Sequence, residues 1–231
     1  MPDYTLYYWS IPFRGQFVRS VLAHVHASWE EAGIGAAGTQ LGTKPSDQIV
    51  PHMGPPVLSD HVADISLAQM PAILAYLGRK HGLIPIDPAQ AALTDKIVAD
   101  ANDVLYEMTR HNGAQMWNQN SWNAFRPRLA RWMEIFEETG RRYGLTAQAG
   151  YLLDTETPGI ADLASHILWG TMTAKLPPLR PMLDVTAPAI AGLSDRIAGL
   201  PEQEDLRVRS DEEYGDDWCG GEINESIRKV L

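Results

Sequence analysis

The chain has 231 residues, which is enough for one large domain or two smaller ones. Its 19 basic and 29 acidic residues give a net charge of −10, which argues against nucleic acid and anionic membrane surfaces as partners. The single cysteine, Cys219, excludes an internal disulfide and a cysteine-based zinc site. No apolar run is long enough for a membrane span and no signal-peptide pattern opens the chain, so we expect a cytoplasmic protein.

The first third of the chain predicts a small mixed sheet with helices on its faces. Aromatic and β-branched residues favour short strands, and the helical period of Phe17, Val21 and Leu22 predicts a helix after the first strand. Residues 35–55 are rich in Gly, Pro, Asp and Thr, so we expect loop with at most a short helix. The expected elements are strands at 4–9, 29–34, 56–60 and 62–65, and helices at about 14–27 and 69–81.

The second of these helices is predicted to begin near Gln69 and Met70. Ile73, Leu74 and Leu77 form its buried face, and Pro71 suits only the first turn of a helix. A helix start exposes unpaired N–H groups and the positive end of the macrodipole, so it can receive a carboxylate. Capping by water or a side chain is the ordinary alternative.

The segment 83–88 contains two prolines and marks a domain boundary, which gives domains at 1–84 and 89–231. Beyond it the pattern is helical, with little sign of strands. The tail, 201–231, is acidic and polar, and it is either loosely ordered or draped on the body. The expected helices of the second domain lie at 89–113, 121–143, 160–174 and 187–200.

Four motifs, in this order along residues 4–200, resemble those of the cytosolic glutathione transferases. The first is similar to the mu-class opening, the second to the family's cis-proline strand, the third to its Gln-Ser-x-Ala-Ile helix, and the fourth to the cap of its folding-motif helix. The motifs are Tyr8-Trp9-Ser10-Ile11 followed by Arg19, then Pro56–Asp60, Gln69–His81 and Pro158–Asp162. The resemblance implies an α/β thioredoxin-like N-terminal domain followed by an all-α C-terminal helical domain.

The resemblance also implies the chemistry of the first loop. A free thiol has a pKa of about 8.5, so little of it is the nucleophilic thiolate at neutral pH. A phenol, with a pKa of about 10, stays protonated and can donate a hydrogen bond that stabilises the thiolate. Tyr8 is the candidate donor, and Ser10 is the alternative because other classes of the family use a serine hydroxyl from this loop. Without the resemblance, Tyr8 would be read as a strand aromatic.

Binding residues follow from the same resemblance. Trp9 and Arg14 would flank glutathione, and the pair Pro55 and Pro56 would offer backbone groups to its cysteinyl part. The start of the second helix would receive the γ-glutamyl carboxylate. The helical domain would supply the pocket for the electrophile. The residues expected there are Gln69 and Met70 at the helix start, and Tyr106, Met108 and Trp117 in the pocket.

Three positions depart from the family pattern. Met70 replaces a serine whose hydroxyl would bind the carboxylate, a loss of about 1.5–3 kcal/mol. Pro55 lacks the N–H that the residue before the cis-proline offers. Gly159 replaces the Ser or Thr cap, at a cost of a few tenths of a kcal/mol. The first two changes bear on ligand binding and the third only on the fold.

These features predict a glutathione transferase that conjugates the thiolate to small hydrophobic electrophiles in detoxification. Glutathione would be a co-substrate, with no tightly bound cofactor and no metal, since the histidines are scattered. The alternatives are a non-catalytic binding protein of the same fold and a glutathione-dependent peroxidase or isomerase. The resemblance further implies a homodimer, without nucleic acid or membrane partners.

Overall fold

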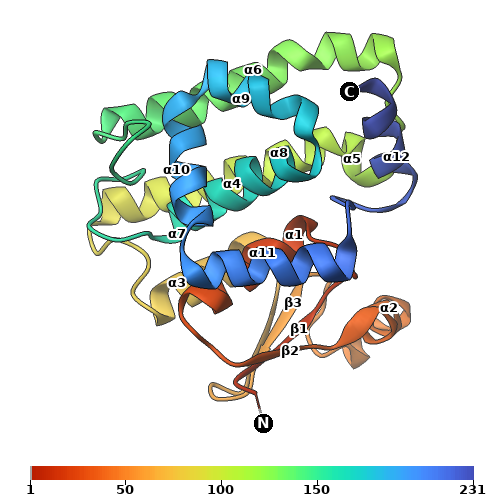
Figure 1. Cartoon of the computed structure of the whole chain (residues 1–231). Coiled ribbons are helices and arrows are strands. Elements are labelled where there is room, and N and C mark those ends of the chain that lie inside the picture. Colours follow the sequence, from red (N-terminus) through yellow and green to blue (C-terminus); the bar gives the residue numbers. More distant parts are fainter. Residues whose placement is uncertain (1) are drawn as a thin grey trace.

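A four-stranded mixed sheet forms the centre of the N-terminal part (Figure 1). The computed structural model describes residues 2–231, and its strands lie in the order β2-β1-β3-β4. β1 is parallel to β2 and antiparallel to β3, and β4 is antiparallel to β3. The strands are β1 (Tyr4–Tyr7), β2 (Trp29–Glu31), β3 (Val57–Asp60) and β4 (Ile65–Ala68).

The last strand begins later than the predicted range 62–65. Oδ1 of Asp60 accepts hydrogen bonds from the backbone N–H groups of Val62 and Ala63, at 3.0 and 2.9 Å. These bonds hold residues 61–64 in a turn, because an aspartate side chain readily bonds to the backbone two residues on. The strand therefore starts at Ile65.

Two helices, α1 and α3, separate the sheet from the helices that follow (Figure 1). α3 starts at Met70, as the position of Pro71 predicts, and it buries Ile73, Leu74 and Leu77. α2 is a ten-residue helix with only Ala37 buried, which begins inside the predicted strand 29–34 and extends into the segment expected to be loop with at most a short helix. The bounds are α1 (Phe13–His24), α2 (Gly33–Gly42), a short 3-10 turn η1 (Pro45–Asp47) and α3 (Met70–Lys80).

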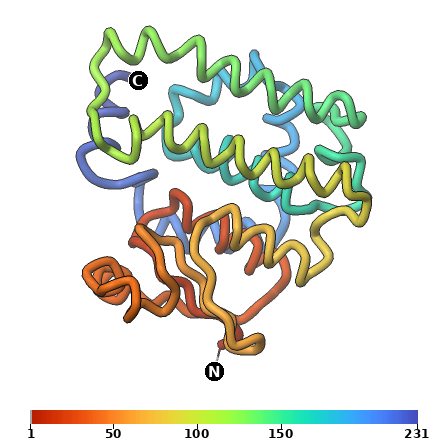
Figure 2. The backbone as a smooth tube through the Cα atoms, turned by 180° about the vertical axis from the view of Figure 1, so that it is seen from behind, coloured from red at the N-terminus to blue at the C-terminus, as the bar shows by residue number. Residues whose placement is uncertain are grey.

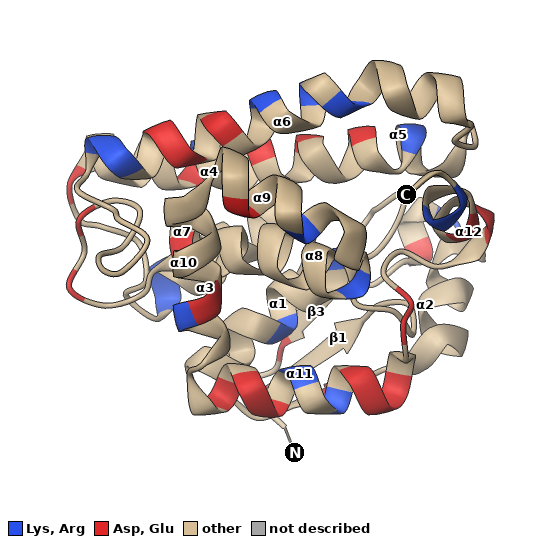
Figure 3. Ribbon diagram, turned by 45° about the horizontal axis from the view of Figure 1, so that its top comes forward, with Lys and Arg blue, Asp and Glu red and all other residues tan. Residues whose placement is uncertain are grey.

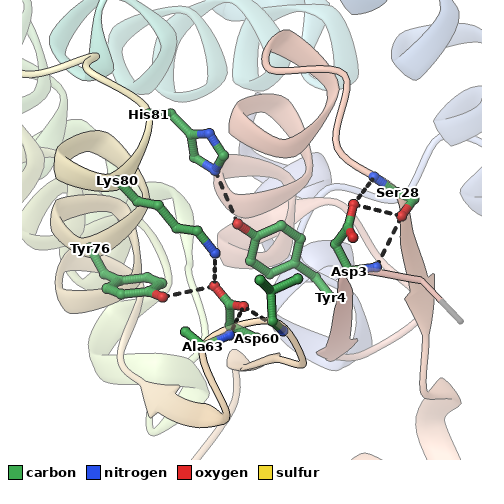
Figure 4. Close-up of polar contacts among 9 residues, drawn as sticks. Asp3, Tyr4, Ser28, Asp60, Ala63, Tyr76, Lys80 and His81 are labelled. Carbon is green, nitrogen blue, oxygen red and sulfur yellow. Dashed lines mark hydrogen bonds and ion pairs between the residues drawn. The ribbon is translucent and has the colours of Figure 1, made fainter.

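Asp60 joins the end of β3 to α3 (Figure 4). Its Oδ2 accepts a hydrogen bond from the Tyr76 hydroxyl at 2.7 Å and pairs with the Lys80 ammonium group. Lys80 also lies over the ring of Tyr4, whose hydroxyl is 3.0 Å from Nε2 of His81. Burial alone would raise the pKa of Asp60, but the hydrogen bonds and the Lys80 charge outweigh it and lower the pKa to about 2. These contacts fix the direction of α3 relative to two strands, β3 through Asp60 and β1 through Tyr4.

The remainder of the chain is helical, and Figure 2 shows it as a separate layer over the N-terminal part. Its core includes Trp169, completely buried, with its ring edge-on to Phe136 at 5.4 Å between centroids. None of the helices within residues 2–231 is both long and apolar enough to cross a bilayer. The bounds are α4 (Pro88–Met108), α5 (Arg110–Gly113), α6 (Gln119–Arg142), α7 (Ile160–Ser165), the π-helix η2 (His166–Thr171), α8 (Met172–Lys175), η3 (Pro177–Leu179), α9 (Arg180–Thr186) and α10 (Pro188–Ala198).

The helices expected at 89–113, 121–143, 160–174 and 187–200 are present, although the first ends at Met108 and the third passes through the π-helix. α9 was not expected. Leu183 is its one buried residue, so its sequence carries little helical periodicity. The division between sheet and helices falls after α3, while the domain bounds 1–84 and 89–231 stay a prediction.

Of the two alternatives expected for the tail, the second is confirmed, because the tail is ordered and packs on the body. It forms α11 (Pro201–Tyr214) and α12 (Gly221–Val230). Gln203 of α11 accepts a hydrogen bond from the Ser20 hydroxyl at 2.7 Å and donates one to the Ser20 carbonyl at 2.9 Å. The charged residues of α11 lie mostly on its outer side (Figure 3), so the acidic composition reflects one exposed face.

Asp162 caps α7 as the fourth motif predicts. Its carboxylate accepts the N–H groups of Gly159 at 2.9 Å and Leu152 at 2.8 Å. A steric constraint explains the glycine at position 159, because a Cβ atom there would lie 2.8 Å from the backbone oxygen of Leu83. That oxygen accepts the N–H of Ile160 at 2.9 Å. The glycine therefore lets the connection between the two parts approach the start of α7.

We expect Gly159→Ser to lower the free energy of unfolding by about 1–3 kcal/mol, because the Leu83 carbonyl must move. Capping preferences alone predict a small gain from serine. Gly38→Ser is the matched control, since no atom lies within 4 Å of a Cβ at Gly38. Urea unfolding of both variants measures the difference, and equal stabilities would contradict the steric explanation.

We expect Asp60→Asn to lower the free energy of unfolding by about 1–3 kcal/mol at neutral pH. The pKa of Asp60 is about 2 in the folded chain against an ordinary value of 3.8. Its stabilising contribution is therefore complete above about pH 5 and is lost as the pH falls toward 2. Urea titrations across this range should show wild type and variant converging at low pH. Asp64→Asn, in the adjoining turn, should show no such convergence, and a pH-independent difference for Asp60→Asn would refute the linkage.

Candidate active site

A cleft of about 490 Å³ lies between the first loop, the end of the sheet and α4. Its lining contains one charged side chain, Arg14, and no carboxylate among the described residues. In a chain of net charge −10, this makes the cleft a local site for an anion. The cleft brings together seven of the residues chosen from the sequence, namely Tyr8, Trp9, Arg14, Pro55, Pro56, Gln69 and Tyr106.

Tyr8 follows β1 and is almost fully buried, although it lines the cleft. Its hydroxyl oxygen accepts the backbone N–H of Arg14 at 3.0 Å, in the first turn of α1. Burial raises the pKa of Tyr8 to about 12, despite the nearby charges of Arg14 and Arg19. The hydroxyl therefore stays protonated at neutral pH, and its proton is available to a ligand atom.

The ring of Tyr8 is positioned by Gly15. A Cβ atom at Gly15 would lie 2.2 Å from Cδ1 of the ring, so no other residue fits there without moving the tyrosine. The first turn of α1 thus approaches the ring closely, which is why its N–H reaches the hydroxyl.

Arg19 holds the loop that follows Tyr8. Its guanidinium donates to the carbonyl of Ile11 at 2.9 Å and, more weakly, to that of Trp9 at 3.5 Å. It also pairs with Glu31 of β2 at 2.8 Å. With only 3% of its surface exposed, Arg19 has no alternative partners in solvent. The contacts of Arg19 with the loop after Tyr8 therefore explain the spacing from Tyr8 to Arg19 in the first motif.

Arg14 reaches across the cleft from α1 to α4. Its Nε donates to Oδ1 of Asn102 at 3.1 Å, and its guanidinium lies 4.8 Å from the ring centroid of Phe13. Burial lowers its pKa, yet an arginine remains charged at neutral pH. Its two terminal nitrogens make no hydrogen bond within residues 2–231, so they are free to bind an anion.

Pro55, Pro56 and Gln69 line the cleft from the start of β3 and the start of α3. The peptide bond between the two prolines is cis, as the resemblance implies. Gln69 precedes α3 with φ 74° and ψ 117°, a conformation that residues with a side chain rarely adopt. The exposed Gln69 side chain lines the cleft beside the N-terminus of α3.

Four of the chosen residues lie elsewhere. Ser10 is exposed at the tip of a tight turn, because the N–H of Ile11 donates to the carbonyl of Trp9 at 2.8 Å and turns Ser10 outward. The Met70 side chain is buried in the core, which leaves only its backbone at the helix start. Met108 and Trp117 do not line the cleft and are corrected to core residues.

Helix periodicity explains the correction for Met108, and a hydrogen bond from the connecting loop explains the one for Trp117. Met108 lies on the face of α4 that buries Val104 and Leu105, whereas Tyr106 lies on the face toward the cleft. Trp117 donates from Nε1 to the carbonyl of Met108 at 2.8 Å and packs edge-on against Trp122. Both side chains therefore stabilise the helical core.

Sequence reasoning did not choose the other residues that line the cleft, among them Asn102, Cys219 and Ile223. Asn102 lies one turn before Tyr106 on α4, so helical spacing from Tyr106 would have found it. Cys219 and Ile223 come from the tail and carry no local signal. Burial raises the pKa of the Cys219 thiol to about 12, which makes it unreactive at neutral pH.

The tail reaches the cleft by capping the first loop. The carbonyl of Trp218 accepts the N–H of Phe13 at 3.1 Å, and the Trp218 ring packs edge-on against Phe13 at 5.2 Å. Phe13 has φ 29°, in the left-handed region that a phenylalanine rarely adopts. The tail thus holds Phe13 in a strained conformation beside Tyr8.

Comparison of sequences matches residues 93–230 to a family described as glutathione S-transferase, C-terminal domain. The chain is also similar to glutathione S-transferase P of Bos taurus, with 31% identity over 104 residues. That match covers 45% of this chain and 48% of the relative, so it spans about half the length of the bovine protein.

Comparison of structures shows the same fold in proteins of low sequence identity. The Pi-class glutathione S-transferase of Onchocerca volvulus has a TM-score of 0.72 at 18% identity, over 91% of this chain and 94% of that one. The structure described as prostaglandin synthase D of Nilaparvata lugens has a TM-score of 0.66 at 18% identity, over 90% and 98%. At this identity the likeness concerns the fold alone.

We expect Gln69→Gly to raise the free energy of unfolding by about 1 kcal/mol, because glycine relieves the cost of the positive φ at this position. Ala72→Gly, two residues into the exposed side of α3, is the control and should lower it by about 1 kcal/mol. Urea unfolding measures both. A loss of stability in Gln69→Gly would mean that the side chain itself stabilises the helix start.

Proposed function

Because the chain belongs to the glutathione S-transferase family, we propose that it binds glutathione in the cleft beside Tyr8 and transfers its thiolate to a small hydrophobic electrophile. The observation that supports this most is the Tyr8 hydroxyl, protonated and directed to a cleft whose one charged side chain is a cation. Glutathione, with two carboxylates, a peptide backbone and a thiol, matches this combination.

The chemistry follows from Tyr8. Its oxygen already accepts the Arg14 N–H, so its proton is the group that can donate to the sulfur of glutathione. This hydrogen bond favours the thiolate and lowers the thiol pKa from about 8.5. The thiolate then attacks an electrophilic carbon, the new C–S bond forms, and the leaving group takes the electron pair of the broken bond.

Each of the other lining residues would contact one of the two substrates, glutathione or the electrophile. The free terminal nitrogens of Arg14 would bind one glutathione carboxylate, and the start of α3 at Gln69 would bind the other through the Met70 N–H. The Pro55 carbonyl would accept a peptide N–H. Apolar side chains of Ile11, Tyr106 and Ile223, on the first loop, α4 and α12, would face the electrophile.

Two observations favour the alternative of a non-catalytic binding or interaction protein with the glutathione-transferase fold. The buried Met70 side chain offers no hydroxyl to the carboxylate, and Pro55 offers no N–H. The first loss weakens binding by about 1.5–3 kcal/mol if the carboxylate takes the family's position, and the second by about 0.5–1.5 kcal/mol because both of its groups are neutral. Peroxide reduction and isomerisation need the same thiolate, so only product analysis separates them from conjugation. The homodimer, the cytoplasmic location and a role in detoxification stay predictions.

Calorimetric titration with glutathione, together with a chlorodinitrobenzene conjugation assay, distinguishes these functions. Binding with turnover supports the transferase, and binding without turnover supports the non-catalytic protein. Absence of binding at millimolar glutathione would refute the transferase and the peroxidase or isomerase, and would leave the non-catalytic protein of the same fold.

We expect Tyr8→Phe to raise the pKa of bound glutathione by about 1–2 units, because one hydrogen bond to a charged sulfur is lost. Turnover at neutral pH should fall about ten- to a hundredfold. The ultraviolet absorbance of the thiolate, followed against pH, measures the pKa. Tyr7→Phe is the control, since Tyr7 belongs to β1 and does not line the cleft. An unchanged thiol pKa in Tyr8→Phe would remove Tyr8 from this role.

A further inference from the structure

The start of α1 depends on the tail of the chain. α1 begins at Phe13 without a capping side chain, because Pro12 occupies the N-cap position. A helix start leaves its first N–H groups without partners inside the helix. The Phe13 N–H donates instead to the carbonyl of Trp218, at 3.1 Å, in the segment between α11 and α12. A residue near the far end of the chain therefore supplies the missing cap.

The next N–H group of the same turn is bonded to Tyr8. The Arg14 N–H donates to the Tyr8 hydroxyl oxygen at 3.0 Å. This N–H belongs to the planar peptide unit that joins Phe13 to Arg14, so its direction is set by the backbone angles of Phe13. Trp218 and Tyr8 thus accept the first two N–H groups of α1, and the conformation of Phe13 links them.

Phe13 needs outside contacts to keep its conformation. Its φ is 29°, whereas residues of an α-helix have φ of about −63°. A bulky residue stays in such a conformation only where the surrounding structure holds it, and strained residues of this kind cluster at active sites. Phe13 is held by the Trp218 carbonyl and by the edge-on contact of the two buried rings, at 5.2 Å. Without Trp218, Phe13 would relax toward a negative φ.

The segment that carries Trp218 is itself fixed. Oδ1 of the buried Asn224, on α12, accepts the N–H groups of Trp218 and Cys219 at 3.3 and 3.4 Å. Gly220 lies against the first loop, since a Cβ atom there would be 3.2 Å from Cγ2 of Ile11. The tail therefore presents the Trp218 carbonyl to α1 from a rigid turn.

We propose, on the basis of the proposed transferase function, that Trp218 is a positioning residue for the Tyr8 hydroxyl. By holding Phe13 at its positive φ, Trp218 keeps the Arg14 N–H directed at the Tyr8 oxygen. This bond occupies the oxygen as an acceptor and leaves its proton to the sulfur of glutathione. Trp218 does not line the cleft, so it acts through Phe13.

A part of the tail away from the Tyr8 cleft provides the control. α11 covers a second cavity of about 620 Å³, whose lining includes Gln16 of α1 and Leu206 of α11. This cavity shares no lining residue with the Tyr8 cleft. Leu206→Ala therefore removes a buried side chain of the tail without changing the cleft.

The pKa of bound glutathione, followed by thiolate absorbance, is the first measurement. We expect Trp218→Ala to raise it by about 1 unit, Trp218→Phe to raise it by less than half as much, and Leu206→Ala to leave it unchanged. Asn224→Ala, which releases the Trp218 N–H but keeps the ring, carries the same expectation if Trp218→Ala does not fold. A shift in Leu206→Ala as large as that in the Trp218 variants would overturn the proposal.

The pH profile of turnover separates positioning from a general loss of structure. In Trp218→Ala, turnover should fall about tenfold at about pH 6.5 and recover above about pH 9, where the thiol ionises without help. A loss of the same size at every pH would overturn the positioning role.

Phe13→Gly and Phe13→Ala, each combined with Trp218→Ala, test the positive φ. Both double variants lack the two rings, and they differ by one methyl group that disfavours a positive φ. We expect the glycine variant to have the lower thiol pKa, by about 0.5 unit. Equal values would refute the link through Phe13.

Hydrogen exchange of the Arg14 amide, measured by NMR on the ligand-free chain, does not depend on glutathione. We expect Trp218→Ala to speed this exchange about tenfold relative to Leu206→Ala. Equal exchange in the two variants would overturn the positioning role whether or not glutathione binds. Failure of the wild-type chain to bind glutathione would refute the transferase instead, and the exchange rates would still decide whether Trp218 holds the Arg14 N–H on Tyr8.

Discussion

The geometry of the Tyr8 cleft depends on the buried guanidinium of Arg19. This one group pairs with Glu31 of β2, donates to the carbonyl of Ile11 and lies under the ring of Tyr214, 5.1 Å from its centroid. It therefore connects the sheet, the loop after Tyr8 and α11. A buried charge that lost these partners would be strongly unfavourable, so the three elements keep a single arrangement. The same contacts restrict the conformation of the loop after Tyr8, which closes one side of the cleft.

α1 is the wall shared by both cavities. Arg14, in its first turn, reaches into the Tyr8 cleft, and Gln16, two residues later, lines the cavity beneath α11. Successive side chains of a helix point in different directions, so residues only two positions apart can line two different cavities. α11 covers this side of α1 and is held there by the hydrogen bonds between Gln203 and Ser20. The tail is thus a structural component of both cavities.

The two cavities differ in electrostatics more than in size. In the Tyr8 cleft, Arg14 lacks a carboxylate partner and the start of α3 adds a positive dipole, which together suit an anionic ligand. Beneath α11, every lining cation is paired with an aspartate. The departures at Met70 and Pro55 reduce hydrogen bonding in the cleft but leave its charge intact. In the proposed function, affinity for glutathione would therefore rest more on charge than on the family's usual polar contacts.

The sequence by itself determined the sheet, the start of α3 at Met70 and most of the helices, because these depend on local periodicity and on the backbone limits of proline. Its motifs also selected Tyr8, Arg14 and Gln69, which line one cleft, and the spacing of the first motif reflects local contacts such as that of Tyr8 with Gly15. Only the tertiary structure decided that Met108 faces the core, that Cys219 and Ile223 reach the cleft, and that Gln16 meets His166 and Ser194 across a second cavity. The contacts of Cys219, Ile223 and Gln16 join residues more than a hundred positions apart, and no local pattern of hydrophobicity specifies which distant helix covers which face.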